Sequence, residues 1–63
     1  MEGFVKFFNT EKFYGFISNE AGDFFFHGSA LVGDVAKGDR VNFELTDGHR
    51  GRICAINVQR TTG

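Results

Sequence analysis

Apolar and polar residues alternate with a period of two along much of this 63-residue chain. The clearest case is the run from Val41 to Thr46, where Val41, Phe43 and Leu45 are separated by polar residues. Such alternation is typical of a strand with one buried face. The same criterion predicts four further strands, over 3–8, 13–18, 24–27 and 54–59. Helical periodicity is weak throughout, so the pattern predicts an all-β chain.

The order of these segments restricts the architecture. Three strands joined by short turns form a meander, the long connection 29–37 follows with one helical turn predicted at 29–31, and two strands complete the chain. Five short strands bury their apolar faces either as a sandwich or by closing on themselves, and closure removes exposed sheet edges. We therefore predict a five-stranded antiparallel barrel of the OB type, a single domain spanning 1–63. An SH3-like barrel is the alternative on strand count.

Alternation also divides the side chains between interior and surface. We predict that the core is made of nine side chains: Val5, Ile17, Phe24, Phe26, Val41, Phe43, Leu45, Ile56 and Val58. In the second strand Gly15 shares the inward face with Ile17, and its missing side chain leaves room where a curled sheet bends. Tyr14 and Phe16 then point outward from the barrel.

The third strand adds two more outward side chains. His27 is the residue there least suited to burial without a partner, so it is predicted to face solvent together with Phe25. Lys6 and Lys12 stand beside the first aromatic cluster in the sequence. Flat exposed rings beside cations suit nucleobases beside phosphates. A purely aromatic core is the competing interpretation, but the nine core residues already fill so small a barrel.

Composition narrows the function further. The formal net charge is −1, so a nucleic-acid binder of this kind depends more on stacking than on counterion release, and its affinity should vary only mildly with salt. The single cysteine, Cys54, cannot form a disulfide within the chain, and no apolar run approaches the length of a membrane span. Without the features of a signal peptide, the chain is expected to be cytoplasmic, with no membrane partner.

Catalysis and metal binding would have to use His27, His49 and Cys54. No spacing among them matches a nucleophile and base pair or a metal site. We therefore predict no enzymatic activity, no metal and no cofactor. Cys54 is expected to be a small buried residue of the last strand, and His49 a turn residue.

At this level of detail the chain resembles the bacterial-type cold-shock domain over nearly its whole length. Residues 3–9 are similar to the opening strand of that family, Lys12 to Ile17 to its first ribonucleoprotein motif, and Phe24 to His27 to its second. Three later segments, residues 29–31, 38–44 and 57–58, also resemble segments of that family and occur in the same order. The resemblance implies an OB-type barrel that binds single-stranded RNA and DNA with low sequence preference. Family members act as RNA chaperones, and some are induced on cooling.

The resemblance also assigns roles to individual positions. It implies base stacking by Phe7, Tyr14, Phe16, Phe25 and His27. It implies that Lys6 and Lys12 contact the backbone or base edges, that Asn9 adds a polar contact, and that Phe8 belongs to the motif but is half-buried. Arg50 and Arg52, near a position where the family usually has proline, are expected to add phosphate contacts. The role of Phe7 comes from the resemblance alone.

Several positions depart from the family pattern. Phe7 stands where tryptophan is usual, Phe13 replaces a glycine, and Gly28 replaces an aromatic residue after the histidine. The connection 31–38 is shorter than usual. We therefore expect fewer stacking positions than in relatives. The chain is expected to be mostly monomeric, with a dimer formed by strand exchange as an alternative.

Overall fold

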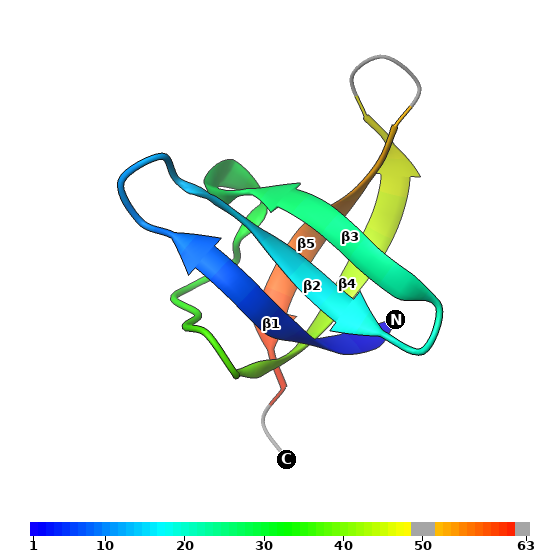
Figure 1. Ribbon diagram of the computed structural model, residues 1–63, viewed down its shortest axis with the longest axis horizontal. Helices are drawn as coiled ribbons and strands as arrows, with labels where there is room; N and C mark the ends of the chain where they lie inside the picture. The colour runs from blue at the N-terminus through cyan, green and yellow to red at the C-terminus, as the bar shows by residue number, and fades with distance from the viewer. Residues whose placement is uncertain (49–51, 62–63) are drawn as a thin grey trace.

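The computed structural model describes residues 1–48 and 52–61. Its elements, in chain order, are β1 (Glu2–Asn9), β2 (Tyr14–Asn19), β3 (Gly22–His27), the 3-10 turn η1 (Gly28–Ala30), β4 (Arg40–Asp47) and β5 (Ile53–Arg60) (Figure 1). Every predicted strand is present within two residues of its predicted bounds, and the helical turn begins one residue earlier than expected. Nothing helical in the described ranges is long and apolar enough to cross a membrane.

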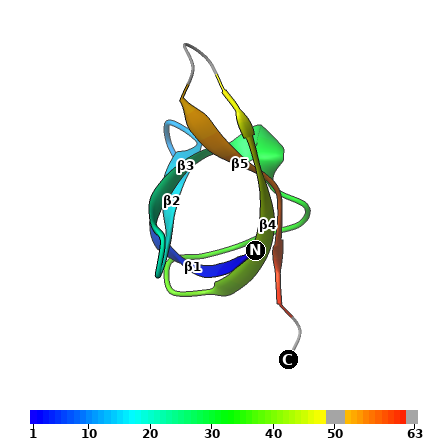
Figure 2. The same cartoon turned by 90° about the vertical axis from the view of Figure 1, so that its right-hand side faces the viewer.

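The five strands form a closed barrel in the order β1-β2-β3-β5-β4, seen as a ring in Figure 2. Four neighbouring pairs are antiparallel, whereas β3 and β5 are parallel. The predicted five-stranded barrel of the OB type is confirmed, with β3 and β5 as its one parallel pair. Strand direction can alternate around a ring only when the number of strands is even, so a closed ring of five must contain one parallel pair.

The barrel interior contains most of the predicted core. Six predicted residues are fully or almost fully buried, namely Val5, Ile17, Phe26, Val41, Phe43 and Val58. Phe24 and Leu45 are partly buried against them. Two buried residues were not predicted: Ala55 from β5 and Val35 from the long connection. The connection therefore contributes to the core as well as joining two strands.

A β-bulge at Asn57 changes which side chains of β5 face inward. Asn57 has φ 50°, and the pairing of β4 with β5 shifts by one residue at this point. Asparagine adopts this left-handed conformation more readily than most residues, and its amide donates a hydrogen bond to Glu44 (3.1 Å). Because the extra residue reverses the alternation, Ala55 is buried while Ile56 and Cys54 are only half-buried. The predicted burial of Ile56 and Cys54 is wrong for this reason.

Gly15 is buried on the inner face of β2, as predicted. A Cβ atom at this position would lie 2.8 Å from Cζ of Phe26 and would collide with the carbonyl oxygen of Phe7. The missing side chain therefore lets β1 and the Phe26 ring pack closely against β2, which fixes the curvature of the sheet that carries the outer rings.

Candidate nucleic-acid interface

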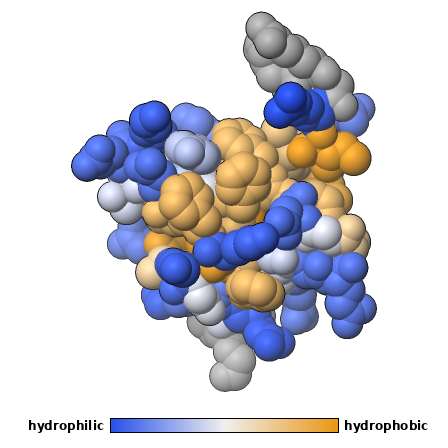
Figure 3. Space-filling model, in the orientation of Figure 1, coloured by the Kyte–Doolittle hydropathy of each residue, from blue (hydrophilic) through white to orange (hydrophobic). Residues whose placement is uncertain are grey.

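The outward rings of β2 and β3 lie side by side on one face of the barrel. The strand register pairs Tyr14 with His27 and Phe16 with Phe25, which confirms the arrangement predicted from alternation. The Tyr14 and Phe25 rings are stacked with centroids 5.8 Å apart, and Phe16 meets the edge of Phe25 at 5.8 Å. Figure 3 shows hydrophobic side chains gathered over β1, β2 and β3, bordered by hydrophilic ones.

A second β-bulge brings Phe7 onto the same face. Val5 pairs with Ile17, but Phe7 pairs with Phe16, so Lys6 is an extra residue in β1. Strict alternation from the buried Val5 would turn Phe7 inward; the bulge turns Lys6 and Phe7 both outward. The Phe7 and Tyr14 rings meet edge to face at 5.9 Å. We call the surface formed by Phe7, Tyr14, Phe16, Phe25 and His27 the aromatic face.

The rings of the aromatic face are partly exposed, since each one packs against a neighbour. Phe7 is 41% exposed, Phe16 36% and Phe25 37%. Contiguous apolar surface of this kind on a small protein marks a binding surface. Phe8 points the other way and is half-buried, with its ring centroid 5.7 Å from that of Phe26. Its predicted half-burial is confirmed.

His27 is held in place by the turn that follows it. Its Nδ1 accepts a hydrogen bond from the backbone N–H of Ser29 (3.1 Å) and lies 2.9 Å from the Ser29 hydroxyl. These contacts cap η1 and leave the imidazole exposed at the end of β3. The orientation of the ring is therefore fixed by η1.

Lys6 and Asp23 form an ion pair at the border of the aromatic face. The Lys6 Nζ atom lies 2.9 Å from Oδ2 of Asp23, and both side chains are exposed. The pair joins β1 to β3 across the intervening β2. Hydrogen bonds from Lys6 and then Ser18 lower the pKa of Asp23 below its ordinary value of 3.8. Lys6 is thus next to the rings but shares its charge with a carboxylate.

Asn9 and Lys12 belong to the turn between β1 and β2. The Asn9 side-chain oxygen accepts hydrogen bonds from the backbone N–H groups of Glu11 and Lys12, each 3.0 Å long. This arrangement is typical of asparagine in a turn. Asn9 therefore shapes the turn, and Lys12 is exposed on it.

Arg52 lies beside the opposite end of the aromatic face. A cavity of about 230 Å³ is lined by Phe16, Phe25, Arg52, Ile53 and Cys54. The structure thus brings Arg52 next to two of the predicted stacking rings, although it is far from them in the sequence. Arg50, predicted to have a similar role, and His49 lie outside the described residues.

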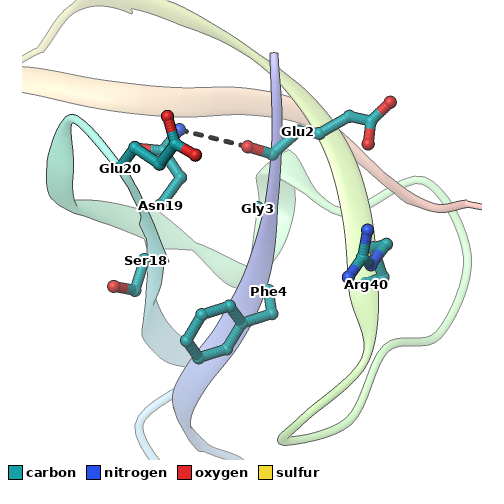
Figure 4. A pocket seen from close by; sticks show the side chains of 7 residues that line it. All are labelled: Glu2, Gly3, Phe4, Ser18, Asn19, Glu20 and Arg40. Atoms are coloured by element: carbon teal, nitrogen blue, oxygen red, sulfur yellow. Dashed lines mark hydrogen bonds between the residues drawn. The ribbon is translucent and has the colours of Figure 1, made fainter.

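A second hollow lies away from the aromatic face. Figure 4 shows it between β1, β2 and β4, lined by Glu2, Gly3, Phe4, Ser18, Asn19, Glu20 and Arg40. The amide of Asn19 donates to the backbone oxygen of Glu2 (3.1 Å). Phe4, 48% exposed, is the one aromatic side chain lining it. With two carboxylates beside one arginine, this hollow has neither the ring cluster nor the net positive charge expected around a nucleic-acid strand.

Comparison with known proteins agrees with this geometry. The family model described as the 'Cold-shock' DNA-binding domain matches residues 1–61. Cold shock-like protein CspE of Bacillus anthracis is 50% identical over 56 residues, covering 81% of this chain and 84% of the relative. The Major cold shock protein of Micrococcus luteus is 45% identical, covering 92% and 94%. The exposed aromatic cluster and these matches together show a nucleic-acid-binding protein, and the chain belongs to the cold-shock DNA-binding domain family.

Proposed function

We propose that this protein binds single-stranded RNA and DNA with low sequence preference, by stacking unpaired bases on the aromatic face. The observation that carries the proposal is the outward placement of five rings on three adjacent strands. Four of them, Phe7, Tyr14, Phe16 and Phe25, pack on one another and stay partly open to solvent, and His27 is exposed beside them. Every nucleobase has a flat π-face, so stacking selects for unpaired bases but scarcely for sequence.

In the proposed complex the phosphates stay toward solvent and meet the cations at the rim of the face. Lys6 lies at one border, Lys12 on the β1–β2 turn and Arg52 beside the cavity at the other end. Stacking contributes about 1–3 kcal/mol per base. Three or four stacked bases, after the cost of ordering the strand, correspond to an affinity on the order of micromolar or tighter.

A stacking site of this kind also explains RNA chaperone activity, which we propose for this protein. Paired bases cannot stack on the rings, so the protein captures strands that melt transiently and shifts the folding equilibrium of the RNA by mass action. No nucleotide hydrolysis is needed. The site as proposed binds and does not catalyse a reaction.

We further propose that the protein works as a cytoplasmic monomer. The closed barrel supports the monomeric state, since each of the five strands has a neighbouring strand on both sides. Light scattering coupled to size-exclusion chromatography should give the mass of one chain. A stable species of twice that mass would indicate strand exchange instead.

The decisive experiment is a parallel titration at low salt of labelled heptathymidine and of a proline-rich peptide, the ligand of an SH3-like barrel. We expect the oligonucleotide to bind and the peptide not to bind. A duplex of the same length should bind much more weakly than the single strand. Binding of the peptide without binding of heptathymidine would refute the proposal.

A further inference from the structure

We infer that Phe13 provides an additional base-stacking position beyond the end of the aromatic face, and that Gly28 is the residue that makes room for it. The inference rests on the proposed binding of single strands. Phe13 lies in the turn between β1 and β2 and is 48% exposed. It is thus the most exposed ring next to the aromatic face. The proposed stacking of bases on the aromatic face does not use it.

The backbone of Phe13 is held firmly in an uncommon conformation. Its φ is 60°, in the left-handed region that a phenylalanine seldom adopts. The Phe13 N–H donates to the carbonyl oxygen of Asn9 (2.8 Å), and its carbonyl oxygen accepts from the N–H of Gly28 (2.7 Å). Both hydrogen bonds hold the main chain of Phe13 in this conformation, so the point from which its side chain leaves the turn is set by the fold.

The Phe13 ring packs directly on the backbone of Gly28. A Cβ atom added to Gly28 would collide with the Cγ, Cδ1 and Cδ2 atoms of Phe13. Any other residue at 28 would therefore displace the ring. The large side chain at 13 and the absent side chain at 28 are complementary, so the ring of Phe13 occupies the space that a side chain at 28 would fill.

The Phe13 ring continues the aromatic face. Its centroid lies 5.7 Å from the His27 ring, at an interplanar angle of 81°, and 6.3 Å from that of Phe8. His27 in turn is paired with Tyr14 in the sheet register. Lys12, the preceding residue, is exposed and offers a cation for a phosphate. The chemistry suits one more unpaired nucleotide of any base identity, at the end of a strand already stacked on the aromatic face.

The test is the dependence of affinity on oligonucleotide length. Oligothymidines of increasing length are titrated into wild type and Phe13→Asn. Asparagine tolerates positive φ, so the turn is kept while the ring is removed. We expect the affinity of Phe13→Asn to stop increasing about one nucleotide earlier than that of wild type. For the longest strand we expect a loss of about fivefold or more. Phe13→Trp should restore the wild-type behaviour.

Phe4→Ala is the matched control, because Phe4 is equally exposed but lies outside the aromatic face; it should leave the length dependence unchanged. Gly28→Ala, which displaces the ring without removing it, should shorten the length dependence as Phe13→Asn does. If wild type binds heptathymidine but Phe13→Asn matches it at every length, the role of Phe13 is refuted and the proposed function stands. If wild type does not bind at all, the proposed function itself fails.

Discussion

Lys6 and Asp23 form an ion pair across β2, with 2.9 Å between Nζ and Oδ2. The two residues line one shallow pocket together with Phe7 and Phe16, two rings of the aromatic face. A phosphate approaching these rings therefore competes with Asp23 for the ammonium group of Lys6. The cation is positioned by the carboxylate and partly neutralised by it.

Replacing Lys6 by glutamine should raise the pKa of Asp23 toward its ordinary value of 3.8, since Lys6 is the main cause of the lowered pKa. A carboxyl group whose pKa is lower in the folded state contributes stability above its unfolded pKa and loses it as the pH falls through the folded pKa. Wild type should thus lose more stability than Lys6→Gln between about pH 5 and pH 3. A carboxyl-carbon NMR titration and melting curves measure both effects. An unchanged Asp23 pKa in the variant would contradict the assignment.

Phe16→Ala and Phe25→Ala should each weaken binding of heptathymidine by more than about tenfold. Because the two rings pack on each other and are about two-thirds buried, each change should also lower the free energy of unfolding by roughly 1–2 kcal/mol. Fluorescence anisotropy and thermal denaturation separate the two effects. Phe4→Ala is the control on the same barrel. An equal loss of binding in Phe4→Ala would show that the binding surface is not confined to the aromatic face.

Phe7→Trp should tighten binding by roughly threefold, because the indole has more surface for a base to stack on. It also introduces the only tryptophan of the chain, whose fluorescence should be quenched by an oligonucleotide. Phe4→Trp places the same probe outside the aromatic face. Its emission should change little, and quenching in both variants alike would argue against a role for Phe7.

Gly15→Ala should destabilise the protein by about 1–3 kcal/mol, the usual cost of overpacking. The added methyl group meets the Phe7 carbonyl oxygen and the Phe26 ring, and neither can move without disturbing the sheet. Ser18→Ala, at a half-buried position of the same strand, should change the melting temperature far less. A melting temperature for Gly15→Ala equal to that of wild type would show that β1 can shift freely against β2.

Binding should depend only mildly on salt. With Lys6, Lys12 and Arg52 as phosphate contacts, the logarithm of the affinity should fall against the logarithm of the salt concentration with a slope of about −2, since each contact on a single strand contributes about 0.7. Arg52→Gln should reduce the steepness by about 0.7. A wild-type slope steeper than about −4 would mean that electrostatics, not stacking, dominates.

The period-two pattern was enough to predict the strands, the barrel and the outward placement of Tyr14, Phe16, Phe25 and His27. These residues lie in β2 and β3, whose register with each other is regular. In a regular antiparallel pair, local alternation and the identity of one inward residue fix the face of every other residue. That is why the central part of the candidate site could be inferred without any long-range information.

The two β-bulges could not be inferred in the same way. One extra residue reverses the alternation, and whether a strand accommodates it depends on a partner distant in the sequence. Lys6 therefore brings Phe7 onto the aromatic face against the pattern, and Asn57 moves Ile56 out of the core. The burial of Val35 likewise depends on how the long connection covers the barrel. The packing of Phe13 on Gly28 joins two turns that no periodicity relates.

The parallel pair β3–β5 is the most sparsely paired part of the barrel. In the part of the chain that the structure describes, β3 and β5 share one paired position, Phe25 with Cys54, and a bridge between Leu31 and Val58 continues the parallel pairing. Two strands with so few paired positions separate locally at lower free energy than strands paired along their length. Phe25 lies at this parallel pair, as does the cavity that Phe25 lines together with Arg52 and Cys54. We therefore expect the barrel to open locally between β3 and β5 before it opens between β1 and β2, where more positions are paired.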